Sequence, residues 1–149
     1  AAANRRWRLD EMSVFLVPHG LKTLTAPLPE TVRFARQVQG LCAGPEICIG
    51  NIEGKPSLAD WRDLSTHKKT LIIPMLAGGG THAREDLPEL IDARDGEEIE
   101  ILDPIGQWPE LPGLVLDEAG RHVARLAGMA VPLGPTGGDI WAERMARSA

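Results

Sequence analysis

Three side chains of types that bind metal ions or move protons follow three successive strand-like runs of the chain. They are His19, Glu53 and His82, and they lie about 30 residues apart, the length of a βαβ unit. Because the carboxyl ends of parallel strands meet at one edge of a sheet, we expect these side chains to lie together there, where ligands of open α/β sheets bind. Two imidazoles and a carboxylate suit first-row divalent ions. The sequence therefore predicts a metal-handling site.

Glycine follows two of these three residues. His19-Gly20 closes the first run and Glu53-Gly54 the second, and glycine lets the chain turn sharply beside a ligand. A neutral imidazole at a strand end can bind a metal or take a proton near neutral pH. Taken singly, His19 is equally compatible with a turn histidine bonded to backbone, and Glu53 with a solvated carboxylate. Their convergence at one edge favours chemistry.

A glycine-rich segment, Gly78–Gly80, precedes His82. Its backbone can approach a bulky ligand closely, so Gly79 and Gly80 are predicted to bind substrate, and the nearby Arg84 can pair with a carboxylate. The same glycines are compatible with a phosphate-binding module. The chain lacks the P-loop and dinucleotide-binding fingerprints, however, and this weakens the phosphate interpretation.

The remaining two histidines are predicted to lie outside this site. His67 precedes a strand-like run, which places it at the opposite edge of the sheet, and His122 falls inside a helical segment. We interpret both as surface residues.

Four runs have the length and composition of strands. Ser13–Pro18 and Thr70–Leu76 are almost continuously apolar, as expected of strands buried on both faces. Glu46–Ile49 and Glu98–Leu102 begin with alternation of polar and apolar residues, which favours positions toward the edges of the sheet. These patterns predict a flavodoxin-like α/β domain whose four-stranded, mainly parallel sheet has the order 2-1-3-4, with helices on both faces.

Helical patterns separate the strands. Phe34, Val38 and Leu41 are spaced as one face of a first helix, which the following Gly44-Pro45 closes. Ser57 begins a pattern resembling a capping box and predicts a second, short helix.

Two further helices are expected. Asp86 has the position of an N-cap with Pro88 in the first turn, and Gly96 is predicted to end that helix. Apolar residues between Val115 and Leu126 predict a fourth helix that ends near Gly128.

Length, charge and composition limit the classes of protein to which this chain can belong. The chain has 149 residues, enough for one domain with a sizeable core. Its net charge of -5 argues against nucleic acid or an anionic membrane as partners, and no apolar run approaches the ~20 residues that span a bilayer. Cys42 and Cys48 are not spaced as a CxxC motif, and Cys48 is predicted to be a buried apolar residue. A reduced, cytoplasmic protein is expected.

The predicted organisation has three parts. Residues 1–12 form a basic N-terminal extension, residues 13–132 a single α/β domain, and residues 133–149 a C-terminal tail with a short helix. The chain does not begin with Met, which favours a piece of a longer protein.

With these residues in hand, the chain resembles the homomeric tetrapyrrole chelatases of the CbiX and CbiK types, which insert cobalt into sirohydrochlorin. The matching segments are Pro18-His19-Gly20, Ile52–Leu58, Ile73–Leu76 and His82–Pro88. They cover about half of the chain in the family's order. The chain departs from the family after His19-Gly20, where Leu21 stands in place of a small hydroxyl residue.

The resemblance implies a function and a set of partners. It implies insertion of a divalent metal, cobalt foremost with nickel or iron as alternatives, into a sirohydrochlorin-like tetrapyrrole, without an organic cofactor. It assigns His19, Glu53 and His82 to metal handling and catalysis. Independently of the resemblance, the cations Lys22 and Arg84 are expected to pair with the substrate's carboxylates. A chain of this length implies a homodimer or a second chelatase-like domain. The alternative is a noncatalytic metal- or tetrapyrrole-binding domain of a larger protein.

Overall fold

The computed structural model describes residues 8–41 and 44–129. These fall into two compact units, one reaching Trp108 and one beginning at Pro109, which are described separately. Within the described residues no helix combines the length and apolar character needed to cross a membrane. Cys42 and the predicted tail over residues 133–149 lie outside the described part of the chain.

The first unit is built on a four-stranded sheet. Its strands are β1 (Met12–Val17), β2 (Glu46–Ile49), β3 (Lys69–Pro74) and β4 (Glu98–Ile101). All neighbouring strands are parallel and their order is β2-β1-β3-β4. The flavodoxin-like topology predicted from the sequence is therefore confirmed, including the edge positions of the two alternating runs.

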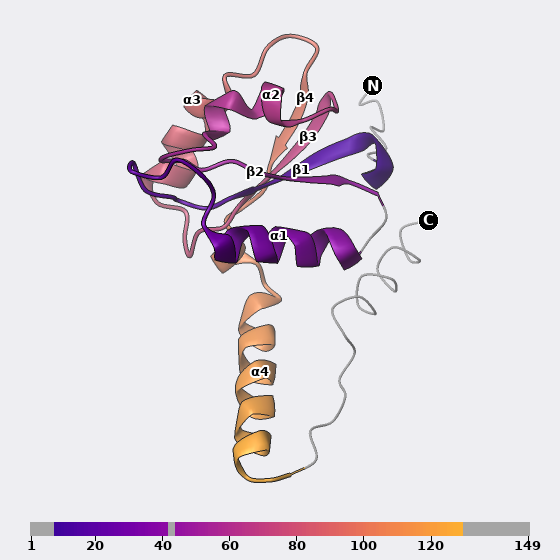
Figure 1. Cartoon of the computed structure of the whole chain (residues 1–149), viewed down its shortest axis with the longest axis vertical. Helices are drawn as coiled ribbons and strands as arrows, with labels where there is room; N and C mark the ends of the chain where they lie inside the picture. The colour runs from indigo at the N-terminus through magenta and orange to yellow at the C-terminus, as the bar shows by residue number, and fades with distance from the viewer. Residues whose placement is uncertain (1–7, 42–43, 130–149) are drawn as a thin grey trace. The chain divides into compact units, whose positions relative to one another are not determined.

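Helices cover both faces of this sheet (Figure 1). Helix α1 (Pro29–Leu41) lies on one face, and α2 (Trp61–Leu64) and α3 (Leu87–Ile91) lie on the other. Short 3-10 helices span Leu9–Glu11, Leu58–Asp60 and Ile105–Gln107, and a π-helical turn spans His82–Asp86. As predicted, Ser57 caps the second helical segment, because its side chain accepts a hydrogen bond from the Ala59 N–H at 3.2 Å.

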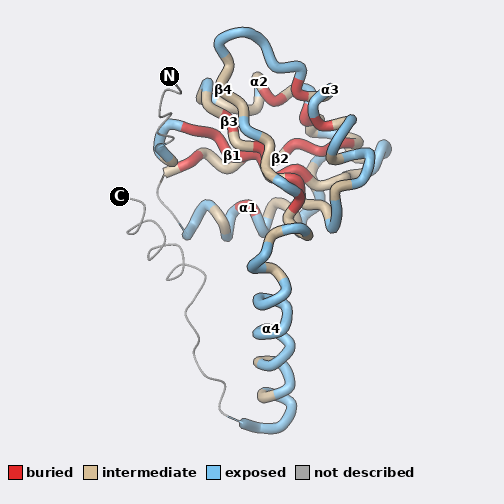
Figure 2. Tube along the Cα trace, turned by 180° about the vertical axis from the view of Figure 1, so that it is seen from behind, coloured by how far each residue is buried: buried red, intermediate tan, exposed pale blue. Residues whose placement is uncertain are grey.

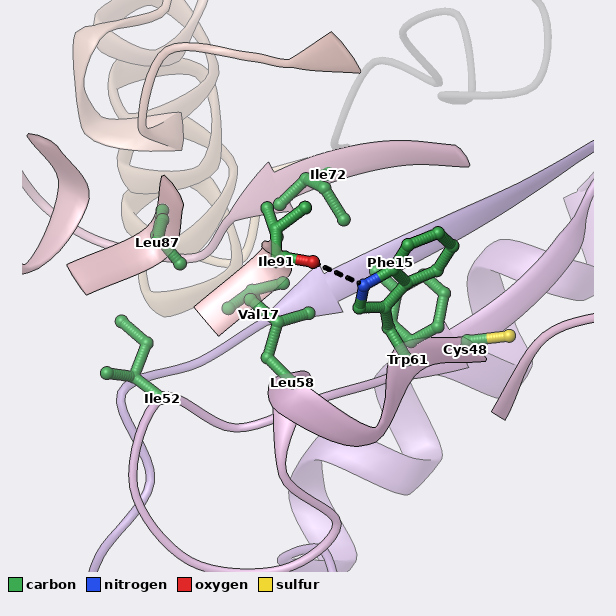
Figure 3. Packing of buried hydrophobic residues seen from close by; sticks show 9 residues of the cluster. All are labelled: Phe15, Val17, Cys48, Ile52, Leu58, Trp61, Ile72, Leu87 and Ile91. Carbon is green, nitrogen blue, oxygen red and sulfur yellow. Dashed lines mark hydrogen bonds between the residues drawn. The ribbon is translucent and has the colours of Figure 1, made fainter. Parts of the chain in front are cut away.

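The main core lies between the sheet and the α2–α3 side (Figure 2). Phe15 and Ile72, adjacent in the sheet, are fully buried there, and Leu58 and Leu87 close over them from the helices. Trp61 adds the largest ring and donates its indole N–H to the Ile91 carbonyl at 2.9 Å (Figure 3). A buried indole needs such a partner, and this bond ties α2 to the end of α3.

Cys48 is buried in this core, as predicted. Its thiol lies 3.2 Å from the Leu64 carbonyl oxygen. Burial, with a smaller contribution from the charge of Glu46, raises the pKa of the thiol to about 12. The side chain therefore behaves as a small apolar residue and not as a nucleophile.

Of the three apolar residues spaced as one face of α1, two are largely exposed. Phe34 and Leu41 are 41% and 58% exposed, whereas the inward side carries the buried Ala35 and the partly buried Val38. The Gln39 side chain bonds to two backbone groups at the start of β2, each at 3.0 Å. This polar anchor and the small Ala35 set the rotation of the helix, and apolar spacing alone does not reveal them.

Two further expectations need correction. Strand β3 is buried on alternate residues only, because Leu71 and Ile73 point to a face that is partly covered. Helix α3 ends before Gly96: Asp92 adopts a left-handed conformation, with φ of 42°, and terminates it. Asp86 precedes α3 without a side-chain capping bond, and its carboxylate is used elsewhere.

The described part of the second unit consists mainly of α4 (Leu111–Leu126), which confirms the predicted fourth helix. Gly128 follows it with φ of 65°, in keeping with its predicted role at the end of the helix.

Candidate metal site at the carboxyl edge of the sheet

The loops after β1 and β2 are joined at the carboxyl edge of the sheet. Beyond the strands proper, the Ile52 N–H donates to the Pro18 carbonyl at 3.2 Å and the Glu53 N–H to the His19 carbonyl at 2.8 Å. Gly20 and Glu53 form an isolated parallel bridge. The backbones that carry His19 and Glu53 are therefore hydrogen-bonded to each other and extend the pairing of β1 and β2.

Two glycines make this junction possible. Gly20 and Gly54 have φ of 75° and 88°, which side-chain-bearing residues rarely adopt. A Cβ at Gly20 would overlap the Glu53 carbonyl oxygen, and one at Gly54 would overlap the Leu21 carbonyl oxygen. Both glycines predicted to allow sharp turns thus also allow the two loops to touch.

The two histidines of the predicted site face each other. His19 Nε2 lies 3.4 Å from His82 Nε2, and the rings meet edge to face with centroids 4.6 Å apart and an interplanar angle of 83°. His19 Nδ1 lies 3.0 Å from the Gly20 carbonyl oxygen, which can only accept, so Nδ1 carries the proton. His82 Nδ1 lies 2.5 Å from Asp86 Oδ2, a second acceptor.

These contacts determine which nitrogens are free. In the neutral imidazoles both protons reside on Nδ1, and two Nε2 lone pairs then point toward the same space. Two such acceptors repel one another unless a cation lies between or beside them. Nitrogens bound to one tetrahedral ion at about 2.0–2.1 Å are about 3.3–3.4 Å apart. The observed separation is compatible with two ligands of a single metal ion, and equally with a hydrogen bond between the two nitrogens when one of them carries a proton.

Exposure makes this pair accessible. The side chain of His82 is 51% exposed, and His19 is partly buried beside it. A metal ion can reach the pair from solvent, and the ion's remaining coordination positions stay open.

Glu53 lies at the same edge but is engaged with a cation. Its side chain is 29% exposed, and Oε1 is 3.8 Å from Nζ of Lys22, which is itself 84% exposed. Within the described residues no group of three or more His, Cys, Asp or Glu side chains is placed to hold a metal ion. The structure thus brings His19 and His82 together and shows Glu53 paired with Lys22.

The predicted substrate-binding residues border the histidines in sequence. Gly80 has open space where a Cβ would stand, whereas a Cβ at Gly79 would press on the Gln107 side chain. Arg84 is exposed on the same π-helical turn as His82. The open surface at Gly80 and the cation at Arg84 are suited to an anionic ligand.

Sequence reasoning missed one member of this arrangement, Asp86. Its position in the sequence predicts a helix cap, but its carboxylate bonds the His82 imidazole. The signal was the spacing, since residues four apart on a helix lie on one face.

The two excluded histidines differ in their surroundings. His122 is exposed on α4, as predicted. His67 precedes β3, but it is half-buried and hydrogen-bonded, so its interpretation as a surface residue is wrong in that respect. Its Nδ1 is 3.2 Å from Ser13 Oγ and 3.5 Å from Glu46 Oε2.

Comparison with known proteins adds no family assignment. No protein-family model matches the chain, and no curated protein matches it.

Proposed function

We propose that this protein inserts a divalent metal ion, cobalt foremost, into a sirohydrochlorin-like tetrapyrrole. The observation that carries the proposal is the pair of facing Nε2 atoms, 3.4 Å apart, with both Nδ1 atoms held by acceptors. That arrangement leaves two neutral imidazole lone pairs directed at one ion. Imidazole nitrogen binds cobalt, nickel and iron, so the ligands do not distinguish these metals. Cobalt is placed first because the motifs resemble those of cobalt chelatases.

A chelatase must bind its metal and then release it. Closed structural sites surround an ion with four protein ligands, whereas two histidines at an exposed edge leave most positions to water. Water exchanges for pyrrole nitrogens as the macrocycle approaches. A two-histidine site is therefore suited to delivery, and the metal ion is here a substrate.

The surroundings fit a macrocycle that is apolar in its plane and carboxylated at its rim. Leu21, next to the His19-Gly20 pair, is 56% exposed and offers an apolar contact. Lys22 and Arg84 are exposed cations for the rim carboxylates. These charges favour an anionic ligand locally, although the whole chain has a net charge of -5.

Insertion also requires removal of protons. A free-base macrocycle loses two pyrrole N–H protons when one divalent ion enters, which balances the charge. Glu53, partly exposed at the same edge, is assigned as an acceptor, and a histidine that has released the metal is the other.

The test is an anaerobic insertion assay with cobalt(II) and sirohydrochlorin, in which the absorbance change of the macrocycle reports insertion. We expect a rate that rises in proportion to protein concentration above the protein-free background. Cobalt binding without any acceleration would contradict the proposal and identify a noncatalytic metal-binding domain. Binding of the macrocycle without binding of cobalt would contradict the assignment of the histidine pair as the metal site.

A further inference from the structure

The carboxylate of Asp86 is placed to control the direction of His82. The two side chains lie on the π-helical turn over His82–Asp86, four residues apart, with Oδ2 of Asp86 2.5 Å from Nδ1 of His82. Their side chains are 37% and 51% exposed, so neither is held by burial in the core. The bond between them is therefore the main restraint on the His82 ring that the structure shows, besides its contact with His19.

Asp86 has no competing role in the helix that follows. It stands where an N-cap would stand for α3, but its side chain makes no capping hydrogen bond. The next residue is the fully buried Leu87, which anchors this end of the turn in the core. Asp86 thus joins a fixed point of the fold to an exposed imidazole.

We propose that Asp86 is a positioning residue for the metal ligand His82. It accepts the Nδ1 proton, selects the tautomer whose Nε2 is free, and holds that lone pair toward Nε2 of His19, 3.4 Å away. His19 receives the matching restraint from a backbone carbonyl, that of Gly20. This inference rests on the proposed function, because it assigns a role toward the metal handled there.

A hydrogen bond from a metal-binding imidazole to a carboxylate fixes its tautomer and raises its basicity, and loss of such partners costs about 10- to 100-fold in metal affinity. Removing Asp86 should therefore weaken metal binding even though the carboxylate does not touch the ion. Without Asp86, the His82 ring can rotate and its proton can move to Nε2, the atom that must bind.

The experiment compares cobalt(II) affinity in the full chain for Asp86→Ala, Asp86→Asn and Glu85→Gln. Glu85 is the matched control, because it is an exposed acid on the same turn and its substitution removes the same charge. We expect Asp86→Ala to bind about 10- to 100-fold more weakly and Asp86→Asn to lose less, since the amide oxygen still accepts. Glu85→Gln should change affinity less than about threefold.

A second measurement reads the tautomer without any metal. The nitrogen-15 shifts of His82 in the apo protein should show a proton on Nδ1 in the wild type and a mixture of tautomers in Asp86→Ala. Equal affinity losses in Asp86→Ala and Glu85→Gln would reduce the effect to charge and overturn the inference. An unchanged His82 tautomer in Asp86→Ala would also overturn it.

The proposed function and this inference fail differently. If His82→Ala binds cobalt as the wild type does, the metal site itself is misplaced. If His82→Ala loses affinity while Asp86→Ala does not, the site stands and only the role of Asp86 is wrong.

Discussion

Two groups of polar side chains lie at opposite ends of the same sheet and use their hydrogen bonds differently. At the amino end, Glu46 Oε2 accepts from the Ser13 hydroxyl at 2.7 Å and from the Thr66 N–H and hydroxyl at 2.9 and 3.0 Å. His67 Nδ1 lies 3.5 Å from the same oxygen. In this amino-end cluster the Glu46 carboxylate joins β1 and β2 to the loop before β3.

At the carboxyl end the restraints act on only one side of each imidazole. Nδ1 of His19 and of His82 is held, while the two Nε2 atoms face each other 3.4 Å apart. A buried or half-buried polar group that is satisfied stabilises the fold, whereas acceptors left facing one another are available to a ligand. A histidine beside a carboxylate therefore joins secondary-structure elements at the amino end of the sheet, whereas at the carboxyl end it keeps one ring nitrogen directed at the other histidine.

The largest expected difference between the two ends comes from replacing one histidine at each end by alanine. His82→Ala removes one of two facing ligands and should weaken cobalt(II) binding at least as much as loss of a supporting partner does, by about 100-fold. Thermal unfolding should change little, because the half-exposed side chain contributes little packing. Calorimetric titration and a melting curve measure the two effects.

His67→Ala is the matched control for that variant. It should leave cobalt affinity unchanged and lower the stability instead, since His67 is hydrogen-bonded at the amino end. Equal losses of metal affinity in the two variants would erase the distinction between the ends.

A smaller effect is expected from Glu46→Ala. The substitution leaves Ser13 and the Thr66 N–H without their acceptor and should lower the free energy of unfolding by about 1–3 kcal/mol at neutral pH, with metal affinity unchanged. Denaturant titration measures the first quantity. A shifted cobalt affinity would show that the two ends are coupled.

The pH dependence follows from the same carboxylate. Burial by itself raises the pKa of Glu46, but hydrogen bonds from the Thr66 N–H, Ser13, the Thr66 hydroxyl and His67 outweigh it and hold the pKa below its ordinary value. A carboxyl whose pKa is lowered in the folded state stabilises the fold fully above its unfolded pKa of about 4.3, and it loses that contribution as the pH falls through the folded value. The difference in stability between wild type and Glu46→Ala should therefore shrink below about pH 4. A constant difference across that range would contradict the assignment.

The smallest effects concern the exposed cations at the carboxyl end. Lys22→Gln and Arg84→Gln should each weaken binding of a carboxylated tetrapyrrole a few-fold, and less so in high salt, because exposed ion pairs contribute at most about 1 kcal/mol. Cobalt affinity alone should stay the same in Arg84→Gln. Absorbance titration of the tetrapyrrole at two ionic strengths separates the contribution of these cations to its affinity from that of the histidine pair. A loss of affinity that does not depend on salt would exclude charge pairing by Lys22 and Arg84.

The sheet could be predicted from sequence because its determinants are local. Runs such as Ser13–Pro18 are apolar enough to reveal a central strand, and the parallel order then places His19 and His82 at one edge. The rotation of α1 could not be predicted, because it depends on side-chain bonds from Gln39 to the backbone at the start of the next strand, which apolar spacing does not reveal.

The finer arrangement of the site depends on side-chain geometry that residue types do not encode. Nothing in the identities of His19 and His82 reveals that both Nδ1 atoms find acceptors. Asp86 illustrates the same limit, since capping and bonding to His82 are equally compatible with its position in the sequence.

The junction between the first two loops also bears on mutational tolerance. A scan that selects only for folded protein should retain glycine alone at positions 20 and 54, since every other side chain would collide with a neighbouring carbonyl. Such intolerance beside His19 and Glu53 resembles the signature of a catalytic residue. Here the intolerance arises because two backbones touch. A ranking of positions by intolerance to substitution would therefore place Gly20 and Gly54 among the most constrained residues, although neither has a reactive side chain.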